Sequence, residues 1–347
     1  MAKLTRILSI DGGGIRGIIP ARVLVSLEEK LRARDGDAVR LADYFDLVAG
    51  TSAGGILACL YLCRAARGSD RPRFSAAQAL AMFRDRGETI FELPLLHRVR
   101  SFGGWIDERY PAAGLERTLG EFFDAIELSD LLRPCLITAY DICQRKAVFF
   151  EQHRAAAEAS RNFLVRDVAR ATSAAPTYFE VACVQSRTGE LFPLVDGGVF
   201  ANNPALCAYA AVRKTRFAAA AGLPKSPTAR DMVILSLGAG SAEKPYAPEK
   251  ARNWGRMGWA KPLFDIIVSG VSETVEYQLE AIFDAVDRPG QYLRIQPDLS
   301  GYGREVTELD DASPGNAALL ARIGAETARR FDRELDELVA LLREPEA

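Results

Sequence analysis

Ser52 lies in Gly50-Thr51-Ser52-Ala53-Gly54, which is a G-x-S-x-G sequence. An apolar stretch from Phe45 to Ala49 precedes it, and another from Ile56 to Leu62 follows it. This order predicts a strand, a sharp turn that carries the serine, and a helix, which together form a nucleophile elbow. The flanking glycines allow a tight turn that leaves the hydroxyl open to a substrate. Ser52 is therefore a candidate nucleophile, and it requires a base and donors for an oxyanion.

A glycine-rich turn is the candidate source of those donors. Residues 11–17 read D-G-G-G-I-R-G, between a strand predicted at 5–10 and a helix predicted at 18–33. The same glycines match the G-x-G-x-x-G dinucleotide fingerprint, but the next predicted strand ends in Gly50-Thr51-Ser52 and lacks the acidic residue that holds a ribose. Ile18 after Gly17 does not fit a Walker loop. Because free N–H groups at a helix N-terminus stabilise negative charge, we favour an oxyanion hole.

Histidine is scarce in this sequence, and that bears on the identity of the base. Only His97 and His153 are present, and neither adjoins a turn at the end of a predicted strand. We expect both to be solvated or structural. Asp196 ends a strand predicted at 190–195 and precedes two glycines. Asp-Gly is also a common pair in ordinary turns, so Asp196 becomes the candidate base mainly because a suitably placed histidine is missing.

The elements that must position these residues follow α/β order. Strand, glycine turn and helix occur twice within about sixty residues, which predicts an α/β fold with a parallel sheet. Further strands are expected at 134–140, 147–151, 232–237 and 292–296, and further helices at 75–86, 111–123, 165–172, 203–212, 266–283 and 317–342. The segment 241–261 is basic and aromatic, without clear helical periodicity. We expect a single domain over 1–347, with the motifs in 5–212 and residues 230–347 completing the sheet and adding helices.

Composition excludes some classes of function. The formal net charge is −2, from 44 basic and 46 acidic residues, which gives no electrostatic argument for a nucleic acid partner. The sequence shows neither a signal peptide nor an apolar stretch long enough to span a bilayer, which predicts a cytoplasmic protein. The cysteines lack the spacing of zinc ligands, so we expect buried free thiols and no metal site. These cysteines are Cys59, Cys63, Cys135, Cys143, Cys183 and Cys207.

Together these residues resemble the patatin-like phospholipase family. The matching segments lie in the family's order between residue 5 and about residue 325. They are 11–17, 50–54 and 196–198, supported by 171–179, 235–240 and 307–312. The resemblance implies a three-layer α/β/α fold with a mainly parallel central sheet, no cofactor, and a Ser-Asp dyad. It implies Ser52 as nucleophile, Asp196 as base, Gly12, Gly13 and Gly14 as oxyanion donors, and Arg16 as a contact for the lipid phosphate.

The function that this resemblance implies is a phospholipase A-type lipid acyl hydrolase, which cleaves fatty acyl esters of membrane phospholipids through an acyl-enzyme. It is expected to associate peripherally with the inner face of the membrane. A carboxylate is a weak base near neutral pH unless its pKa is raised, so we expect Asp196 to be partly buried. Residues 254–261 and 102–106 are candidates for membrane contact, and packing of their aromatic residues in the core is an equal alternative. Family members commonly have threonine where Ala239 stands.

Other functions remain open from the sequence. Some bacterial relatives are antiphage effectors activated by cyclic nucleotides, so a cyclic dinucleotide activator is one hypothesis and a homo-oligomer another. An acyltransferase or a thioesterase could use the same dyad on another acyl donor. A non-catalytic nucleotide-binding or scaffold protein would use the glycine turn to hold phosphate, and would keep its function after Ser52→Ala.

Overall fold

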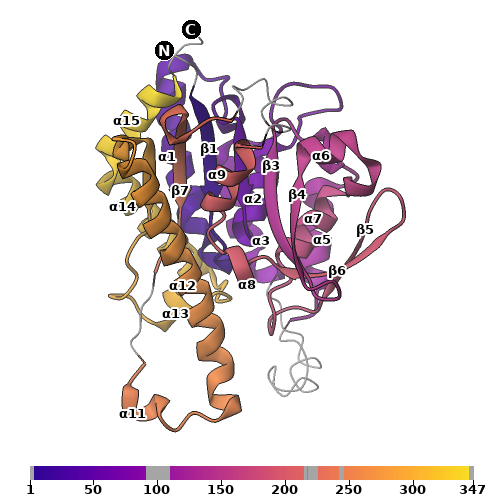
Figure 1. Cartoon of the computed structure of the whole chain (residues 1–347), viewed down its shortest axis with the longest axis vertical. Helices are drawn as coiled ribbons and strands as arrows, with labels where there is room; N and C mark the ends of the chain where they lie inside the picture. The colour runs from indigo at the N-terminus through magenta and orange to yellow at the C-terminus, as the bar shows by residue number, and fades with distance from the viewer. Residues whose placement is uncertain (1–3, 91–109, 215–216, 218–225, 242–245, 344–347) are drawn as a thin grey trace.

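A central sheet lies between two layers of helices in the computed structural model, which describes residues 4–90, 110–214, 217, 226–241 and 246–343 (Figure 1). Within this part of the chain the sheet has eight strands in the order β5-β6-β3-β2-β1-β7-β8, and β4 also pairs with β3. The predicted α/β fold with a mainly parallel sheet is confirmed. The strands are β1 (Thr5–Ile10), β2 (Leu47–Gly50), β3 (Cys135–Asp141), β4 (Lys146–Glu151), β5 (Ala182–Gln185), β6 (Leu191–Asp196), β7 (Met232–Leu237) and β8 (Tyr292–Ile295).

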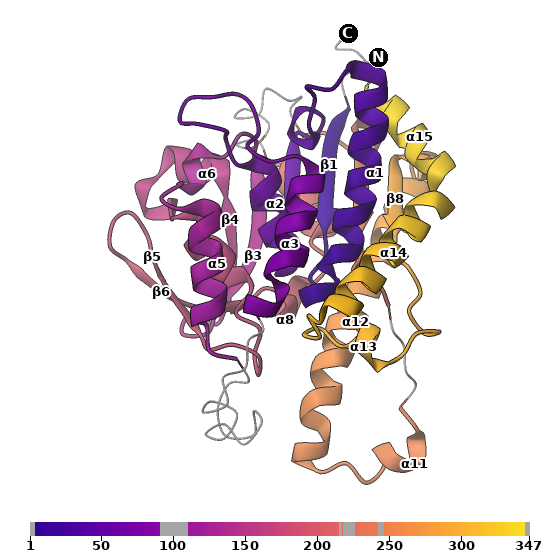
Figure 2. The same ribbon diagram turned by 180° about the vertical axis from the view of Figure 1, so that it is seen from behind.

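Helices cover both faces of the sheet. Figure 1 shows α9 and α12 on one face, and Figure 2 shows α1, α2 and α3 on the other. The helices of the first half of the chain are α1 (Ile18–Asp35), α2 (Ala53–Leu62), α3 (Ala76–Ile90), α5 (Ala113–Phe123), α6 (Gln152–Ala157) and α7 (Val165–Thr172). Those of the second half are α8 (Gly198–Ala201), α9 (Ala205–Val212), α11 (Pro248–Ala251), α12 (Arg256–Asp284), α13 (Arg304–Thr307), α14 (Pro314–Arg330) and α15 (Asp332–Leu342).

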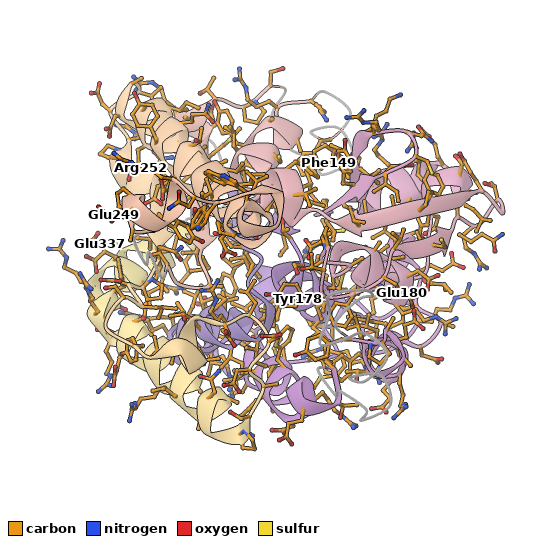
Figure 3. All side chains as sticks on the ribbon, turned by 90° about the horizontal axis from the view of Figure 1, so that it is seen from below. Phe149, Tyr178, Glu180, Glu249, Arg252 and Glu337 are labelled. Carbon is orange, nitrogen blue, oxygen red and sulfur yellow. The ribbon has the colours of Figure 1, made fainter. Side chains whose placement is uncertain are left out.

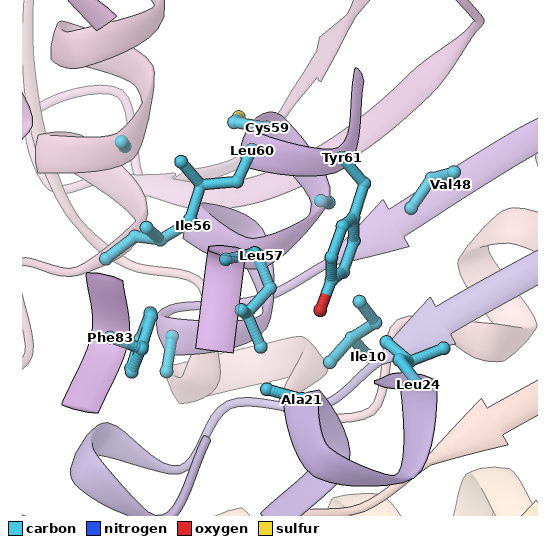
Figure 4. Packing of buried hydrophobic residues seen from close by; sticks show 14 of the residues in the cluster. Ile10, Ala21, Leu24, Val48, Ile56, Leu57, Cys59, Leu60, Tyr61 and Phe83 are labelled. Atoms are coloured by element: carbon cyan, nitrogen blue, oxygen red, sulfur yellow. The ribbon is translucent and has the colours of Figure 1, made fainter. Parts of the chain in front are cut away.

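The side chains of each central strand alternate between two cores, as the period of a strand requires. In β1, Ile7 faces the core under α9 and α12, whereas Leu8 and Ile10 face the larger core on the opposite side. Figure 4 shows part of that larger core, where apolar residues of α2 and α3 pack with those of α1, β1 and β2. All six residues of β7 are buried, as are five of the six in β1, as expected for parallel strands covered on both faces.

The two edges of β3 explain how the site is assembled. β2 runs parallel to β3 and pairs with residues 135–137, and β6 runs antiparallel and pairs with residues 139–141. β4 pairs with residues 136–141. Because a strand has two edges and β4 occupies one along most of its length, β2 and β6 share the other. Their carboxyl ends therefore meet beside β3, with Gly50 opposite Ile137 and Asp196 opposite Ala139.

Some predictions about the elements were wrong. The segment 241–261 contains α11 and the first turns of α12, which runs on through Pro262. The single helix expected at 317–342 is divided at Phe331 into α14 and α15. β5 and α8, each of four residues, were not predicted. None of the helices in the described ranges combines the length and the apolar sequence needed to cross a membrane.

The expectation of buried thiols holds for only part of the cysteines. Cys59, Cys63 and Cys135 are buried, but Cys143 and Cys183 are exposed and Cys207 is half-buried. Cys183 lies on β5, where alternate side chains point away from the core. All six are free thiols. His97 and the segment 102–106 lie outside the described residues.

Candidate active site

Ser52 occupies a strained turn between β2 and α2. Its backbone has φ 54° and ψ −126°, a conformation that non-glycine residues rarely adopt and that is frequent at functional sites. The turn is also crowded, since a Cβ atom at Gly50 would collide with the backbone of Gly54, and one at Gly54 would collide with the carbonyl of Ile10. Both glycines of the G-x-S-x-G sequence are thus required by close approaches of the backbone. The serine side chain is left half-buried at the N-terminus of α2.

Asp196 ends β6 and lines the same pocket as Ser52. The residue is 4 % exposed, and its carboxylate accepts a 2.7 Å hydrogen bond from the backbone N–H of Gly198. Burial raises the pKa of Asp196 to about 7, while the Ser52 hydroxyl and the N–H of Gly198 oppose the rise. Near neutral pH such a carboxyl group both holds and releases a proton, which is the property of a general base.

The end of α7 and the loop that follows it support both members of this pair. The Oγ1 of Thr172, the last residue of α7, accepts a 2.9 Å hydrogen bond from the backbone N–H of Ser52. Two residues later, the carbonyl of Ala174 accepts a 3.0 Å hydrogen bond from the N–H of Asp196. These positioning roles were not predicted. The only signal in the sequence was that both residues lie in one of the segments that carry the family resemblance.

A threonine pair closes the junction between β2 and β6. The hydroxyl groups of Thr51 and Thr138 are 2.7 Å apart, and the hydroxyl of Thr51 donates to the carbonyl of Ala201 at 2.6 Å. A Cβ atom at Gly197 would collide with Thr138, so the Asp-Gly sequence lets β6 turn directly over β3. Thr51, which precedes Ser52, and Gly197, which follows Asp196, both lie against Thr138 of β3. Thr138 therefore fixes the position of both candidate dyad residues.

The glycine turn after β1 lies beside the elbow. Its three glycines differ in whether their backbone N–H groups have a hydrogen-bond partner. The N–H of Gly12 donates to the carbonyl of Asn202 at 3.1 Å. Those of Gly13 and Gly14 donate to no group in the described part of the chain. Gly14 has φ 54°, and a Cβ atom there would collide with the carbonyl of Leu309. A Cβ atom at Gly13 would collide with the methyl group of Ala239.

A buried ion pair fixes the start of this turn. The carboxylate of Asp11 accepts two hydrogen bonds from the guanidinium of Arg294 on β8, at 2.7 and 3.0 Å. The same guanidinium donates to the hydroxyl of Ser236 on β7. The N–H of Asp11 also donates to the carbonyl of Leu237, so strands from the end of the chain hold a turn near its beginning. Nothing in the sequence pattern singled out Arg294.

The serine, the aspartate and the glycine turn open into one pocket. Figure 3 views the molecule from the end where this pocket lies, with Tyr178, one of its lining residues, near the centre. One part of its wall is polar and includes Ser52, Asp196, Asn202 and Ser173. The remainder is largely apolar and includes Ile56, Phe83, Ile90, Leu115, Phe179 and Val268. An apolar wall beside a nucleophile suits a substrate with an acyl chain.

Arg16 also lines the pocket and lacks an anionic partner there. Its Nε is buried without a hydrogen bond, and no carboxylate of a described residue lies within 4 Å of its guanidinium. Burial lowers the pKa of Arg16 to about 10, while the charge of Asp265 on α12 and the hydroxyl of Tyr178 oppose the change. The group remains protonated at neutral pH. It is a cation available to an anionic part of a ligand.

Histidine is absent from the described lining of the pocket. His153 lies on α6 and packs edge-on against Phe217, 5.4 Å between ring centroids. Burial lowers its pKa. The arrangement around Ser52 therefore supports acyl transfer to a serine with a carboxylate as the base.

The sequence of this chain is similar to those of several known proteins. Residues 8–209 match the sequence model of a family described as patatin-like phospholipase. Patatin-like protein 2 of Oryza sativa subsp. indica is 34 % identical over 93 % of this chain and 83 % of its own length. Patatin-like protein 3 of Arabidopsis thaliana is 32 % identical over 93 % and 80 %. A probable inactive patatin of Solanum tuberosum, 3-Kuras 1, is 33 % identical over 93 % and 86 %.

Solved structures give a weaker comparison. VipD from Legionella pneumophila aligns over 96 % of this chain and 67 % of that one, with a TM-score of 0.40 and 13 % identity. At that TM-score the alignment carries no argument about the fold or the site. Since one of the plant relatives is named as inactive, membership of the family does not by itself establish catalysis. The residues of the pocket must carry that argument.

Proposed function

The chain belongs to the patatin-like phospholipase family, and we propose that it hydrolyses fatty acyl esters of membrane phospholipids through a Ser52–Asp196 dyad. The observation that carries the proposal is that Ser52 and the buried Asp196 line the same pocket, with the pKa of that carboxyl raised to about 7 by burial and influenced by the Ser52 hydroxyl. A carboxylate with the ordinary pKa of aspartate would be a poor proton acceptor for a serine. Family membership supports a lipid acyl hydrolase, and the dyad is the finer part of the proposal.

The reaction begins with transfer of the Ser52 proton to Asp196 as the serine oxygen attacks the ester carbonyl. The tetrahedral intermediate collapses, its bond to the alcohol oxygen breaks, and Asp196 gives the proton to that oxygen. The lysophospholipid leaves, and the acyl group remains on Ser52. Water then attacks this ester while Asp196 takes its proton, and the fatty acid leaves as the proton returns to the serine.

The oxyanion of each intermediate is held by backbone N–H groups. The N–H of Gly12 already donates to the carbonyl of Asn202, so we assign the oxyanion hole to the N–H groups of Gly13 and Gly14. Of the three glycines expected from the sequence, two therefore remain as donors. Ala53 is a further donor, since it directly follows the nucleophile and its N–H lies in the unpaired first turn of α2. Removal of one such donor typically lowers kcat about 10²–10³-fold.

Two other parts of the pocket fit a phospholipid. The apolar wall formed by residues such as Phe83, Leu115 and Phe179 suits the acyl chain. The protonated and unpaired Arg16 suits the phosphate, because a guanidinium forms paired hydrogen bonds with phosphate oxygens. On this basis Arg16→Gln raises KM for phospholipids and leaves hydrolysis of an uncharged short-chain ester nearly unchanged.

The decisive experiment measures hydrolysis of defined phospholipid vesicles and of p-nitrophenyl butyrate by wild type, Ser52→Ala and Asp196→Asn. Both variants are expected to lose at least 10³-fold in kcat on both substrates. His153→Ala and His97→Ala serve as controls and should retain activity. Full activity of either dyad variant, or loss of activity in a folded histidine variant, contradicts the mechanism.

Related functions are separated by their products. An acyltransferase would transfer the acyl group to an alcohol acceptor faster than to water, and a thioesterase would prefer acyl thioesters. A nucleotide-binding scaffold would keep its function in Ser52→Ala. Activation by a cyclic dinucleotide stays a prediction, and it is wrong if such compounds change neither the rate of hydrolysis nor the oligomeric state.

A further inference from the structure

An apolar stripe runs along the first half of α12. Trp259, Leu263, Ile266 and Ile267 are 41, 48, 42 and 39 % exposed. Their spacing, i, i+4, i+7 and i+8, places them on one face of the helix. Large apolar side chains scattered singly over a surface are ordinary, but four on one helical face form a continuous patch, and such patches mark interaction sites.

The stripe belongs to a segment that projects from the body of the molecule. In Figures 1 and 2, α11 and the first turns of α12 extend beyond the end of the sheet near α8. The segment is held together by aromatic contacts, since the ring of Trp254 lies edge-on to that of Trp259 at 5.0 Å and to that of Tyr246 at 5.1 Å. The hydroxyl of Tyr246 also donates to Asp265 on α12. We call residues 246–267 the arm.

The arm is continuous with the wall of the pocket. Val268, next to Ile267 at the end of the stripe, lines the pocket. One turn further along α12, the hydroxyl of Ser272 lies 3.4 Å from the side-chain amide of Asn202, which adjoins the glycine turn. Asp265 in the arm acts electrostatically on Arg16 inside the pocket. A molecule that covers the stripe therefore also lies against the entrance to the catalytic site.

The charge of the arm differs in sign from that of the whole chain. Between residues 246 and 267 the sequence has four basic residues and two acidic residues, whereas the whole chain has a net charge of −2. Arg252 is exposed on this segment, and Figure 3 labels it together with Glu249. The basic residues are Lys250, Arg252, Arg256 and Lys261, and the acidic ones are Glu249 and Asp265. A basic, aromatic segment with an apolar stripe is typical of helices that lie in the interface of anionic membranes.

We propose that the arm binds the surface of an anionic lipid bilayer, with the stripe among the acyl chains and the pocket entrance against the membrane. This inference rests on the proposed function, since it supplies the route by which a phospholipid reaches Ser52. It sharpens the expectation that 254–261 contacts lipid, because the apolar contact extends through Ile267. A second copy of the chain is the alternative occupant of the stripe.

The test uses the chain of residues 1–347 and a double variant, Leu263→Ser/Ile266→Ser. These side chains are 48 and 42 % exposed, so their loss should leave the core and the contact between Trp254 and Trp259 intact. The matched control is Leu191→Ser, because Leu191 is 66 % exposed on β6, which lies next to the edge strand β5 on the other side of the sheet. Binding is measured by co-sedimentation with vesicles of phosphatidylcholine alone or with 30 % phosphatidylglycerol (about one anionic lipid in three). All proteins carry Ser52→Ala here, so that binding is read without hydrolysis.

The double variant is expected to bind anionic vesicles at least tenfold more weakly, whereas Leu191→Ser binds as the parent does. With Ser52 restored, the double variant should lose a similar factor on vesicles and stay within twofold on p-nitrophenyl butyrate. Unchanged binding of the double variant to vesicles overturns the proposal. If the double substitution instead dissociates a dimer and leaves vesicle binding unaffected, the stripe is a dimer interface and the proposal is wrong. If the wild type hydrolyses neither substrate but the double variant still loses vesicle binding, the proposed function is wrong and the proposal that the arm binds membranes is retained.

Discussion

Arg294 and Asp11 form a buried ion pair that joins residues 283 positions apart in the sequence. Their side chains are 5 and 2 % exposed, and two hydrogen bonds connect them. Asp11 directly precedes the glycines that we assign to the oxyanion hole. The pair therefore fixes that turn from the far end of the chain.

Arg294→Met tests this role. The substitution leaves Asp11 buried and unpaired, so we expect the free energy of unfolding to fall by about 3–5 kcal/mol and kcat to fall with it. Urea unfolding of the variant measures the first effect. The double variant Asp11→Asn/Arg294→Met should recover part of the lost stability, because no buried charge remains. A loss below about 1 kcal/mol in Arg294→Met would show that the pair contributes little.

The dependence of the rate on pH should follow Asp196. The base must be deprotonated to accept the serine proton, and its pKa is about 7. Below that value kcat/KM should rise tenfold per pH unit, and above it the rate should level off. Hydrolysis of p-nitrophenyl butyrate between pH 5 and 9 measures the profile. A midpoint near the ordinary pKa of aspartate, or a flat profile, would remove Asp196 from this role.

Asp196→Asn should make the protein more stable at alkaline pH. Because the pKa of Asp196 is raised from 3.8 to about 7 in the folded state, its protonated form stabilises the fold at low pH, and that contribution is lost as the pH rises through about 7. The loss is about 2–3 kcal/mol between pH 5 and 8. Urea unfolding at both pH values should show it in wild type, and the asparagine variant should lack this part of the dependence. An equal dependence in both proteins would contradict the raised pKa.

The contact between Gly13 and Ala239 offers a test by rescue. Gly13→Ala places a methyl group on that of Ala239, which moves the turn, and kcat should fall about 10²–10³-fold. Ala239→Gly makes room for this methyl group, so the double variant should regain much of the rate. Gly120→Ala on α5, where no atom lies within 4 Å of the added methyl group, is the control and should be neutral or slightly stabilising. If the double variant does not regain activity, the loss in Gly13→Ala is not caused by the collision with Ala239.

Local patterns predicted much of the fold because they are short and periodic. Apolar runs bounded by glycine turns located β1, β2 and β7, and G-x-S-x-G located the turn at Ser52. The arm was not predicted, since its apolar side chains face outward and Pro262 interrupts the helical pattern. A sequence period reports which residues share a face, but not what that face contacts.

The supports of the site could not be predicted, for a different reason. Thr172 and Arg294 act through contacts across long stretches of sequence, and each residue type is common in ordinary surroundings. Asp196 could be predicted as the base only because the sequence has two histidines and neither adjoins the end of a predicted strand. The structure places Ser52 and Asp196 in the lining of one pocket, a proximity that neither residue's own sequence surroundings could predict.

Strand β1 lies between β2 and β7, and this order has a consequence for synthesis on the ribosome. A nascent chain of 209 residues, the end of the family match, already contains Ser52 and Asp196 but has neither β7 nor Arg294. One edge of β1 is then open, and Asp11 is unpaired. We expect the oxyanion turn to become ordered only after β7 and β8 have been synthesised. Purified chains that end at residue 212 and at residue 343 should therefore differ in their rate of p-nitrophenyl butyrate hydrolysis.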